Sequence, residues 1–313
     1  MSVGRFCGVG AALAATVAGA LLGGGGVAEA TFAGQNGLLA YSTNGNCDAD
    51  APEGGGCPGF YVEVVNPRQP KQRRAVSPKD ATCCAGDPDW SPDGKRLLYD
   101  SEGDVFVTRR DRSLSRRLIR RAIEPAWSAN GRRLVFARDL HPVGGGRDDR
   151  DLFVRSLRGG QARRITRGGG DSADWSSRGE IAFVRTDRRF RTDVYVVRPD
   201  GTGLRRLTRG NTGDQPSWSP DGRLLAIERR GSDDRLNIAV IDRQGRLKRT
   251  LTREGATDPV WSPDGSRIAF SRRSRRFPIS LLYTVRARGG GLRRLLPRLL
   301  SVHDLDWQPR PRR

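Results

Sequence analysis

The apolar residues of this chain fall in short runs separated by turn residues, and not at helical spacing. After residue 30, runs such as residues 97–99, 105–107 and 224–227 are three to four residues long and rich in β-branched and aromatic side chains. Runs of this kind, bounded by Gly, Pro, Asp and Ser, are typical of strands, and no later segment has the 3.6-residue period of an amphipathic helix. The pattern predicts an all-β chain.

The strand pattern repeats, and every copy contains a tryptophan. The phrase Trp-Ser-Pro-Asp-Gly occurs three times, each time before an apolar run, and looser or truncated copies complete a set of six. The tryptophans of these copies are all those in the chain: Trp90, Trp127, Trp175, Trp218, Trp261 and Trp307. Pro presets φ for a turn, and Asp and Gly accept the conformations that follow it. Each copy therefore predicts a strand, a tight turn and a second strand.

The tryptophans lie 37, 48, 43, 43 and 46 residues apart, which brackets the roughly 40–45 residues of a four-stranded propeller blade. Each interval contains the Trp strand, an apolar strand, a third strand and a basic strand, which predicts blades near residues 87–121, 124–167, 172–209, 215–253 and 258–298. Residues 36–77 lack a Trp strand, and residues 303–309 supply only that strand. We therefore predict a six-bladed β-propeller in which the Trp307 strand joins the first blade, because this closure removes unpaired sheet edges.

The Pro-x-Trp-Ser-Pro-Asp-Gly repeat resembles the WD-like repeat of TolB-type six-bladed β-propellers over about residues 36–309. The resemblance implies an exported propeller that presents its loop face to a protein or a peptidoglycan-associated partner of the cell envelope. One departure from TolB is expected: the small α/β domain that precedes the propeller there is not evident in this sequence. Since propellers carry many unrelated activities, the resemblance specifies the fold better than the function.

Residues 1–30 have the features of an export signal. Arg5 precedes a weakly apolar run over residues 9–22, and Ala28-Glu29-Ala30 fits a small-x-small cleavage site. The run is short for a membrane span, which needs about 20 residues. We predict a cleaved signal peptide over 1–30, a single propeller domain over 31–313 without a membrane span, and a periplasmic, cell-wall-associated or secreted location. An uncleaved anchor is the alternative.

Four cysteines follow the predicted cleavage site: Cys47, Cys57, Cys83 and Cys84. An even number of cysteines in an exported chain indicates disulfides. The first two lie in a loop of the first blade and the last two in the crossover to the second blade, and these loops emerge on the same face of a four-stranded meander. Bridges between the loops are therefore favoured over a Cys83–Cys84 bond. A zinc site is the minor alternative, since no Cys-x-x-Cys spacing is present.

Acidic residues precede the tryptophans where each innermost strand is expected to begin. They lie three or four positions upstream, at Asp87, Glu124, Asp171, Asp214, Asp258 and Asp304. One interpretation is that each carboxylate binds backbone amides of its own crossover turn, and the slipped position in two blades favours it. The other is an acidic rim at the mouth of the central channel, which binds a cation or the basic segment of a partner. We predict no cofactor, although the channel could hold a divalent cation.

The net charge of +21 attracts anionic partners such as wall polymers, phospholipid head groups or nucleic acid. Basic residues crowd the predicted outer strands, as at Arg116, Arg205 and Arg293, where charge on an exposed edge blocks pairing between molecules. We expect a monomer. No aromatic platform lies among the Arg clusters, which disfavours nucleic acid as the partner.

Catalytic motifs are not evident in the sequence. It contains no Gly-x-Ser-x-Gly elbow, and His141 and His303 lie in unrelated loops that offer no Ser-His-Asp set. No Gly-rich loop connects a strand to a helix, as phosphate binding would require. We predict a non-enzymatic scaffold that binds a protein or envelope partner through its loop face and channel mouth. The alternative is a lyase- or lactonase-like propeller enzyme that uses the rim carboxylates on a carbohydrate or small molecule.

Overall fold

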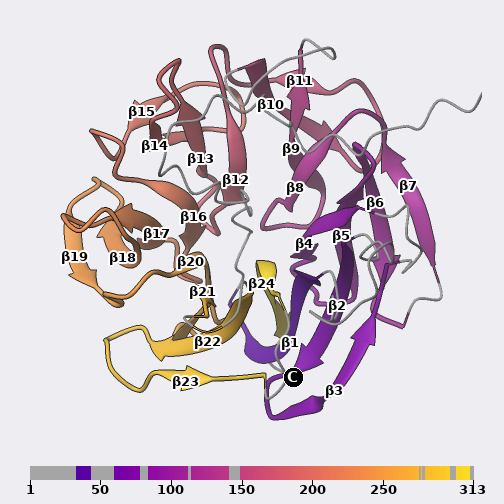
Figure 1. The fold of residues 1–313 in the computed structure, drawn as a ribbon. Coiled ribbons are helices and arrows are strands. Elements are labelled where there is room, and N and C mark those ends of the chain that lie inside the picture. The colour runs from indigo at the N-terminus through magenta and orange to yellow at the C-terminus, as the bar shows by residue number, and fades with distance from the viewer. Residues whose placement is uncertain are drawn as a thin grey trace, which may run out of the picture.

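The computed structural model describes residues 33–43, 60–77, 84–111, 114–140, 149–274, 276, 279–296 and 301–310. Within these residues the chain forms 24 strands and no α-helix. The strands make six four-stranded antiparallel sheets, which follow one another around a central axis (Figure 1). The predicted all-β, six-bladed propeller is confirmed.

The first three blades run from the innermost to the outer strand in the following order. Blade 1 contains β24 (His303–Arg310), β1 (Gln35–Thr43), β2 (Tyr61–Asn66) and β3 (Gln69–Ala75). Blade 2 contains β4 (Ala85–Trp90), β5 (Arg96–Ser101), β6 (Asp104–Arg109) and β7 (Ser115–Ile119). Blade 3 contains β8 (Ile123–Trp127), β9 (Arg133–Asp139), β10 (Arg150–Ser156) and β11 (Arg163–Arg164).

The remaining blades have the same order. Blade 4 contains β12 (Asp171–Trp175), β13 (Ile181–Thr186), β14 (Thr192–Val197) and β15 (Arg205–Arg206). Blade 5 contains β16 (Asp214–Trp218), β17 (Leu224–Arg230), β18 (Leu236–Asp242) and β19 (Leu247–Thr250). Blade 6 contains β20 (Thr257–Trp261), β21 (Arg267–Arg273), β22 (Ser280–Arg286) and β23 (Arg293–Arg294).

The two ends of the chain close the ring, as predicted. Strand β24 pairs antiparallel with β1, with Trp307 opposite Leu39, and the yellow β24 lies beside β1 in Figure 1. The Gln308 side chain extends this closure in two directions. Its Oε1 accepts from the backbone N–H of Leu38 at 2.9 Å, and its Nε2 donates to the Gly94 carbonyl of blade 2 at 2.6 Å.

The Ser-Pro-Asp-Gly phrase forms the turn between the first two strands of a blade. In blade 5, the Ser219 hydroxyl donates to Asp221 Oδ1 at 2.6 Å and accepts from the backbone N–H of Leu224 at 2.9 Å. Gly222 has a φ of 64°, in the left-handed region that favours glycine. An added Cβ there would also lie 2.9 Å from Arg178 Cγ in the preceding blade. Glycine is therefore required both by the turn and by the close contact between blades.

Such contacts join the turns into one end of the propeller, which we call the turn face. A Cβ on Gly131 of blade 3 would lie 3.6 Å from Pro92 of blade 2, and one on Gly265 of blade 6 would lie 3.9 Å from Pro220 of blade 5. Asn36 Nδ2 donates to Asp264 Oδ2 at 2.9 Å, which connects blade 1 to blade 6. The opposite end, where the innermost strands begin, is the crossover face.

The hydrophobic core lies between neighbouring sheets. The largest cluster of buried side chains combines Val107 of blade 2, Trp127 and Val135 of blade 3, and Trp175 and Phe183 of blade 4. Both faces of each middle strand are therefore covered, which explains why these strands are apolar at consecutive positions. The outer edges differ, because Arg116 and Arg293 are exposed there.

Several predictions from the sequence concern residues outside the described ranges. The proposed signal at residues 1–30 and three of the cysteines, Cys47, Cys57 and Cys83, are among them. Cys84 is described and is disulfide-bonded, but the connectivity of the set stays a prediction. No helix among the described residues is long and apolar enough to cross a membrane.

Candidate functional site

Each innermost strand has a left-handed residue three positions before its tryptophan. The φ angles are 52°, 54°, 49°, 46°, 52° and 46° at Asp87, Glu124, Ser172, Gln215, Asp258 and Asp304. The register between the first two strands shifts at this point, as between Gly86 and Asp89 in blade 2 and between Thr257 and Val260 in blade 6. Such bulges re-aim side chains, and Asp is among the non-glycine residues that tolerate positive φ best. The backbone position, and not the acidic side chain, is what all six blades share.

Carboxylates from three blades meet at the crossover face. Burial and the negative charges of Asp100, Asp304 and Glu124 raise the pKa of Asp87 well above its usual value. Asp87 and Asp100 share a side-chain hydrogen bond, which requires a proton on one of the two carboxyl groups. An added Cβ on Gly86 would lie 3.2 Å from Asp304 Oδ2 and 3.8 Å from Asp100 Oδ1. Blade 1 therefore reaches directly over the start of blade 2.

Blade 6 extends this group. Burial, followed by the charge of Asp304, raises the pKa of Asp258 to about 6, and the neighbouring His303 acts in the opposite direction. Asp258 Oδ2 accepts from Thr257 Oγ1 at 3.0 Å, and Asp304 Oδ2 accepts from Ser42 Oγ at 2.5 Å. We call the five carboxyl groups of this region the crossover cluster: Asp87, Asp100, Glu124, Asp258 and Asp304.

Glu124 connects the cluster to blades 3 and 4. Its Oε1 lies 3.3 Å from Arg150 Nη1, and its Oε2 accepts from the backbone N–H of Ser172 at 2.7 Å. Burial opposes the charge of Arg150, but Glu124, Asp139 and Asp171 together raise the pKa of this guanidinium. Asp171, which is only 1% exposed, therefore adjoins the cluster through a cation.

The predicted rim residues do not all have the same surroundings. Asp214 is half-buried and accepts from the backbone N–H of Gln215, 2.9 Å away in its own turn. In blades 4 and 5 the left-handed position is taken by Ser172 and Gln215, so Asp171 and Asp214 precede it by one residue. The turn-binding interpretation thus describes Asp214, whereas Asp87 and Asp258 interact with carboxylates of neighbouring blades.

Sequence reasoning missed one single carboxylate, that of Asp100, and one set of three. Asp100 is on the second strand of blade 2, and no repeat-wide spacing marked it. The set of three lies immediately before the tryptophans, at Asp89, Asp174 and Asp306, each of which is 0% exposed. Each accepts, at 2.5 Å, from the backbone N–H of the tryptophan in the next blade, Trp127, Trp218 and Trp90 respectively. Three Asp-Trp pairs in register were the signal that could have revealed this set.

The buried set before the tryptophans is structural. Burial raises the pKa of Asp174 and of Asp306 well above the usual value, although backbone N–H groups act to lower it. In blade 5 the equivalent position is Ser217, whose Oγ accepts from the backbone N–H of Trp261 at 3.3 Å. Within the part of the chain that the structure describes, no group of three or more His, Cys, Asp or Glu residues has the arrangement of a metal site.

The fold and its repeats define a six-bladed propeller built from WD-like units. Residues 40–262, more than half of the chain, match the family described as PD40, TolB beta propeller domain. The chain belongs to this family, as its repeat predicted.

Three relatives illustrate the extent of the similarity. The Tol-Pal system protein TolB of Nitratidesulfovibrio vulgaris is 37% identical over 79 residues, which are 25% of this chain and 17% of that protein. The protein TolB homolog of Chlorobium luteolum is 34% identical over 130 residues, 40% of this chain and 26% of that protein. The matched segments thus span about a quarter or less of these curated relatives. The crystal structure of TolB from Acinetobacter baumannii has a TM-score of 0.70 at 18% identity and covers 87% of this chain and 67% of that chain. At this identity the likeness shows the fold alone.

Proposed function

We propose that this protein is an exported, non-enzymatic scaffold that binds a protein or a peptidoglycan-associated partner of the cell envelope. Membership of the TolB propeller family supports the proposal. So does the name of the Nitratidesulfovibrio vulgaris relative, which assigns that protein to the Tol-Pal system. Export to the periplasm, the cell wall or the medium is part of the same proposal.

The observation that carries the proposal is the convergence of carboxyl groups at the crossover face. Four blades contribute to the crossover cluster, and the charges of Asp100, Asp304 and Glu124 act together on Asp87. The chain as a whole has a net charge of +21, so this concentration of acidic groups is a local reversal of sign. A basic or extended segment of a partner would be complementary to it, since such charge arrangements steer association and select partners.

Binding, as opposed to catalysis, is favoured by the way these carboxylates are held. Both oxygens of Glu124 are engaged, one with Arg150 and one with the backbone N–H of Ser172. Asp258 is hydrogen-bonded to Thr257. Groups fixed in this way present a stable charge pattern, whereas a general base must be able to reach the proton of a substrate.

The proposal is tested by capturing partners from the cell envelope with the exported protein as bait. Replacing Asp87, Asp258 and Asp304 together by Asn should weaken capture at least about tenfold and reduce its salt sensitivity, because acidic groups of three blades are lost from the crossover cluster. The matched control replaces Arg116, Arg163 and Arg293 of the outer strands by Gln. We omit Arg205 because it forms an ion pair with Glu180. Thermal melts establish that both variants are folded.

The opposite result rejects the assignment. If the outer-strand variant loses the captured partner and the Asn variant retains it, the partner binds the basic belt. If neither variant changes capture, the crossover face is not the docking site.

A further inference from the structure

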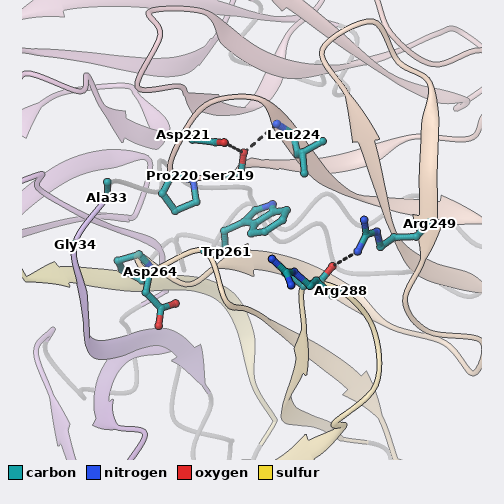
Figure 2. A pocket seen from close by; sticks show the side chains of 13 residues that line it. Ala33, Gly34, Ser219, Pro220, Asp221, Leu224, Arg249, Trp261, Asp264 and Arg288 are labelled. Carbon is teal, nitrogen blue, oxygen red and sulfur yellow. Dashed lines mark hydrogen bonds between the residues drawn. The ribbon is translucent and has the colours of Figure 1, made fainter.

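The turn face contains a pocket of about 780 Å³ between blades 5 and 6. Figure 2 shows the Trp261 indole at its centre, with Pro220 and Leu224 on one side and Arg249 and Arg288 on the other. Trp261 is 3% exposed, and Arg288 is exposed. The pocket lies at the opposite end of the propeller from the crossover cluster. Its ligand can therefore be inferred independently of the function proposed for that cluster.

The neighbouring seam, between blades 4 and 5, shows what such a position can hold. Glu180 immediately precedes Ile181, which pairs with Trp175, just as Leu224 precedes Leu225, which pairs with Trp218. Glu180 therefore occupies the place of Leu224 one blade earlier. Its carboxylate lies between two guanidinium groups: Oε1 is 3.2 Å from Arg205 Nη2, and Oε2 is 2.7 Å from Arg243 Nη2. Burial acts against this charge, but the hydrogen bonds from Arg243 and Arg205 outweigh it and lower the pKa of Glu180.

The seam between blades 5 and 6 keeps the cations and lacks the carboxylate. Arg249 pairs with Val240 as Arg205 pairs with Val196, and it likewise donates to a backbone carbonyl of the next blade, that of Ala287 at 3.2 Å. Ala287 takes the place of Arg243, and the adjacent Arg288 supplies the second guanidinium at the pocket edge (Figure 2). Among the described residues, neither Arg249 nor Arg288 has a carboxylate partner.

Two other seams are covered by their own side chains. Arg96 lies 4.6 Å above the ring centroid of Trp127, and Arg133 lies 5.2 Å from that of Trp175. Both residues occupy the place of Leu224, because each immediately precedes the residue that pairs with the tryptophan of its blade. Leucine is too short and apolar to make this cation–π contact. Trp261 therefore receives no guanidinium from the position of Leu224, and it is among the residues that line the pocket.

The acidic residues of the pocket are already engaged. Asp221 accepts from the Ser219 hydroxyl at 2.6 Å, and Asp264 accepts from the Ser262 hydroxyl at 2.7 Å and from Asn36. The hydrogen-bond donors that remain to be matched are those of the arginines, and the rest of the lining is largely apolar. A ligand with one carboxylate and one apolar group is complementary to this combination.

We propose that this pocket binds a peptide segment of a partner protein through a carboxylate and an adjacent apolar side chain. The carboxylate lies between Arg249 and Arg288, where the neighbouring seam holds that of Glu180. The apolar side chain packs on Trp261, Leu224 and Pro220.

The test is calorimetric titration of residues 31–313, the chain expected after the predicted cleavage, with three acetylated peptides. These are Gly-Leu-Leu with a free C-terminal carboxylate, the same peptide with a C-terminal amide, and Gly-Leu-Glu with a C-terminal amide. We expect saturable binding of at least one carboxylate peptide and binding at least about tenfold weaker for the Gly-Leu-Leu amide, because charge-assisted bonds to arginine are lost. The two carboxylate peptides distinguish a C-terminal from a side-chain source.

Three variants locate the binding. Leu224→Glu recreates the neighbouring seam and should abolish binding, because the new carboxylate occupies the arginines. Arg223→Glu makes a larger charge change one residue earlier, where the side chain is 72% exposed, and should leave binding nearly unchanged. Arg249→Gln should weaken binding at least about tenfold and serves if Leu224→Glu does not fold.

Several results would overturn the proposal. Equal binding of Gly-Leu-Leu with a free carboxylate and of its amide would show that the arginines do not bind a carboxylate. Unchanged binding by Leu224→Glu and Arg249→Gln would show that the ligand binds elsewhere. Saturation only in a chain that begins at Ala33 would mean that the residues before Ala33, and not a partner, fill the pocket. Failure of all three peptides to bind would reject it as well.

Discussion

The two ends of the propeller use the same residue, aspartate, in opposite electrostatic settings. On the turn face, burial acts to raise the pKa of Asp93 and of Asp264, but hydrogen bonds from the neighbouring serine and backbone lower it below the usual value. On the crossover face, burial and nearby carboxylates raise the pKa of Asp87 and of Asp258. Asp93 and Asp264 are held chiefly by hydrogen bonds within their own turns, with an added bond from Asn36 of blade 1 to Asp264, whereas Asp87 and Asp258 interact with carboxylates of other blades.

This difference determines how many blades are affected by a substitution at either end. A turn carboxylate has most of its partners within five residues, so its loss affects mainly one turn, although Asp264 also accepts from Asn36 of blade 1. A carboxylate of the crossover cluster acts on groups from two or three blades, so its loss changes the protonation of its neighbours. The stability of the protein is therefore more sensitive to pH at the crossover face. The turn face is the end at which individual blades can differ from one another, and the pocket between blades 5 and 6 is an example.

The largest effect is expected from removing the strand that belongs to both ends. Strand β24 contributes Asp304 to the crossover cluster and Gln308 to the Gly94 carbonyl on the turn face. Deleting residues 301–313 leaves β1 with an exposed edge, so we expect aggregation or loss of cooperative unfolding. Calorimetry measures the cooperativity of unfolding, and light scattering measures aggregation. Deleting only residues 311–313 is the control, and equal melting of the two deletions would contradict the closure.

The next effect separates the two ends by pH. The folded pKa of Asp258 is about 6 and its ordinary value is 3.8, so between these values the folded state holds a proton that the unfolded state has lost. The free energy of unfolding therefore falls as pH rises through this window, by up to about 3 kcal/mol, since one pKa unit corresponds to about 1.4 kcal/mol. Asp258→Asn should remove the contribution of Asp258 and make the fall measured by urea unfolding between pH 4 and pH 7 smaller; the raised pKa values of Asp87, Asp174 and Asp306 account for what remains.

The turn face provides the control. The lowered pKa of Asp264 means that its stabilisation is complete above its ordinary pKa and is lost only as pH falls below it. Asp264→Asn should therefore lower stability by a similar amount at pH 5 and pH 7. A fall between pH 4 and pH 7 that is as steep in Asp258→Asn as in the original protein would refute the account of the crossover face.

The smallest effect concerns the residues between the two ends. Asp174→Ala removes the acceptor for the backbone N–H of Trp218, and an unsatisfied buried donor costs about 1–3 kcal/mol. Asp174→Asn keeps a carbonyl oxygen there and should cost less than half as much. Urea unfolding of both variants measures the difference. Equal losses would mean that the hydrogen bond between blades contributes little.

The repeat made the fold predictable, because each copy contains its own turn chemistry. Ser, Asp and Gly in the Ser-Pro-Asp-Gly phrase specify a local hydrogen-bonded turn, and the period of the tryptophans specifies the blade. The incomplete first and last copies specified closure. None of these inferences required knowledge of which side chains from different blades lie together.

The candidate sites depended on contacts that spacing does not encode. Asp171 and Asp214 have the same position relative to their tryptophans, yet the charge of the first acts on Arg150 and the second accepts from its own turn. Asp100 acts on the pKa of Asp87 because the second strand of blade 2 returns to the start of the first, where Asp100 pairs with Gly86. Leu224 is an unremarkable strand residue in the sequence, and only the comparison with Glu180 across one seam reveals a pocket. Local turn and period signals act within about 40 residues of chain, whereas burial, pKa shifts and pocket shape arise from side chains that only the closed ring brings together.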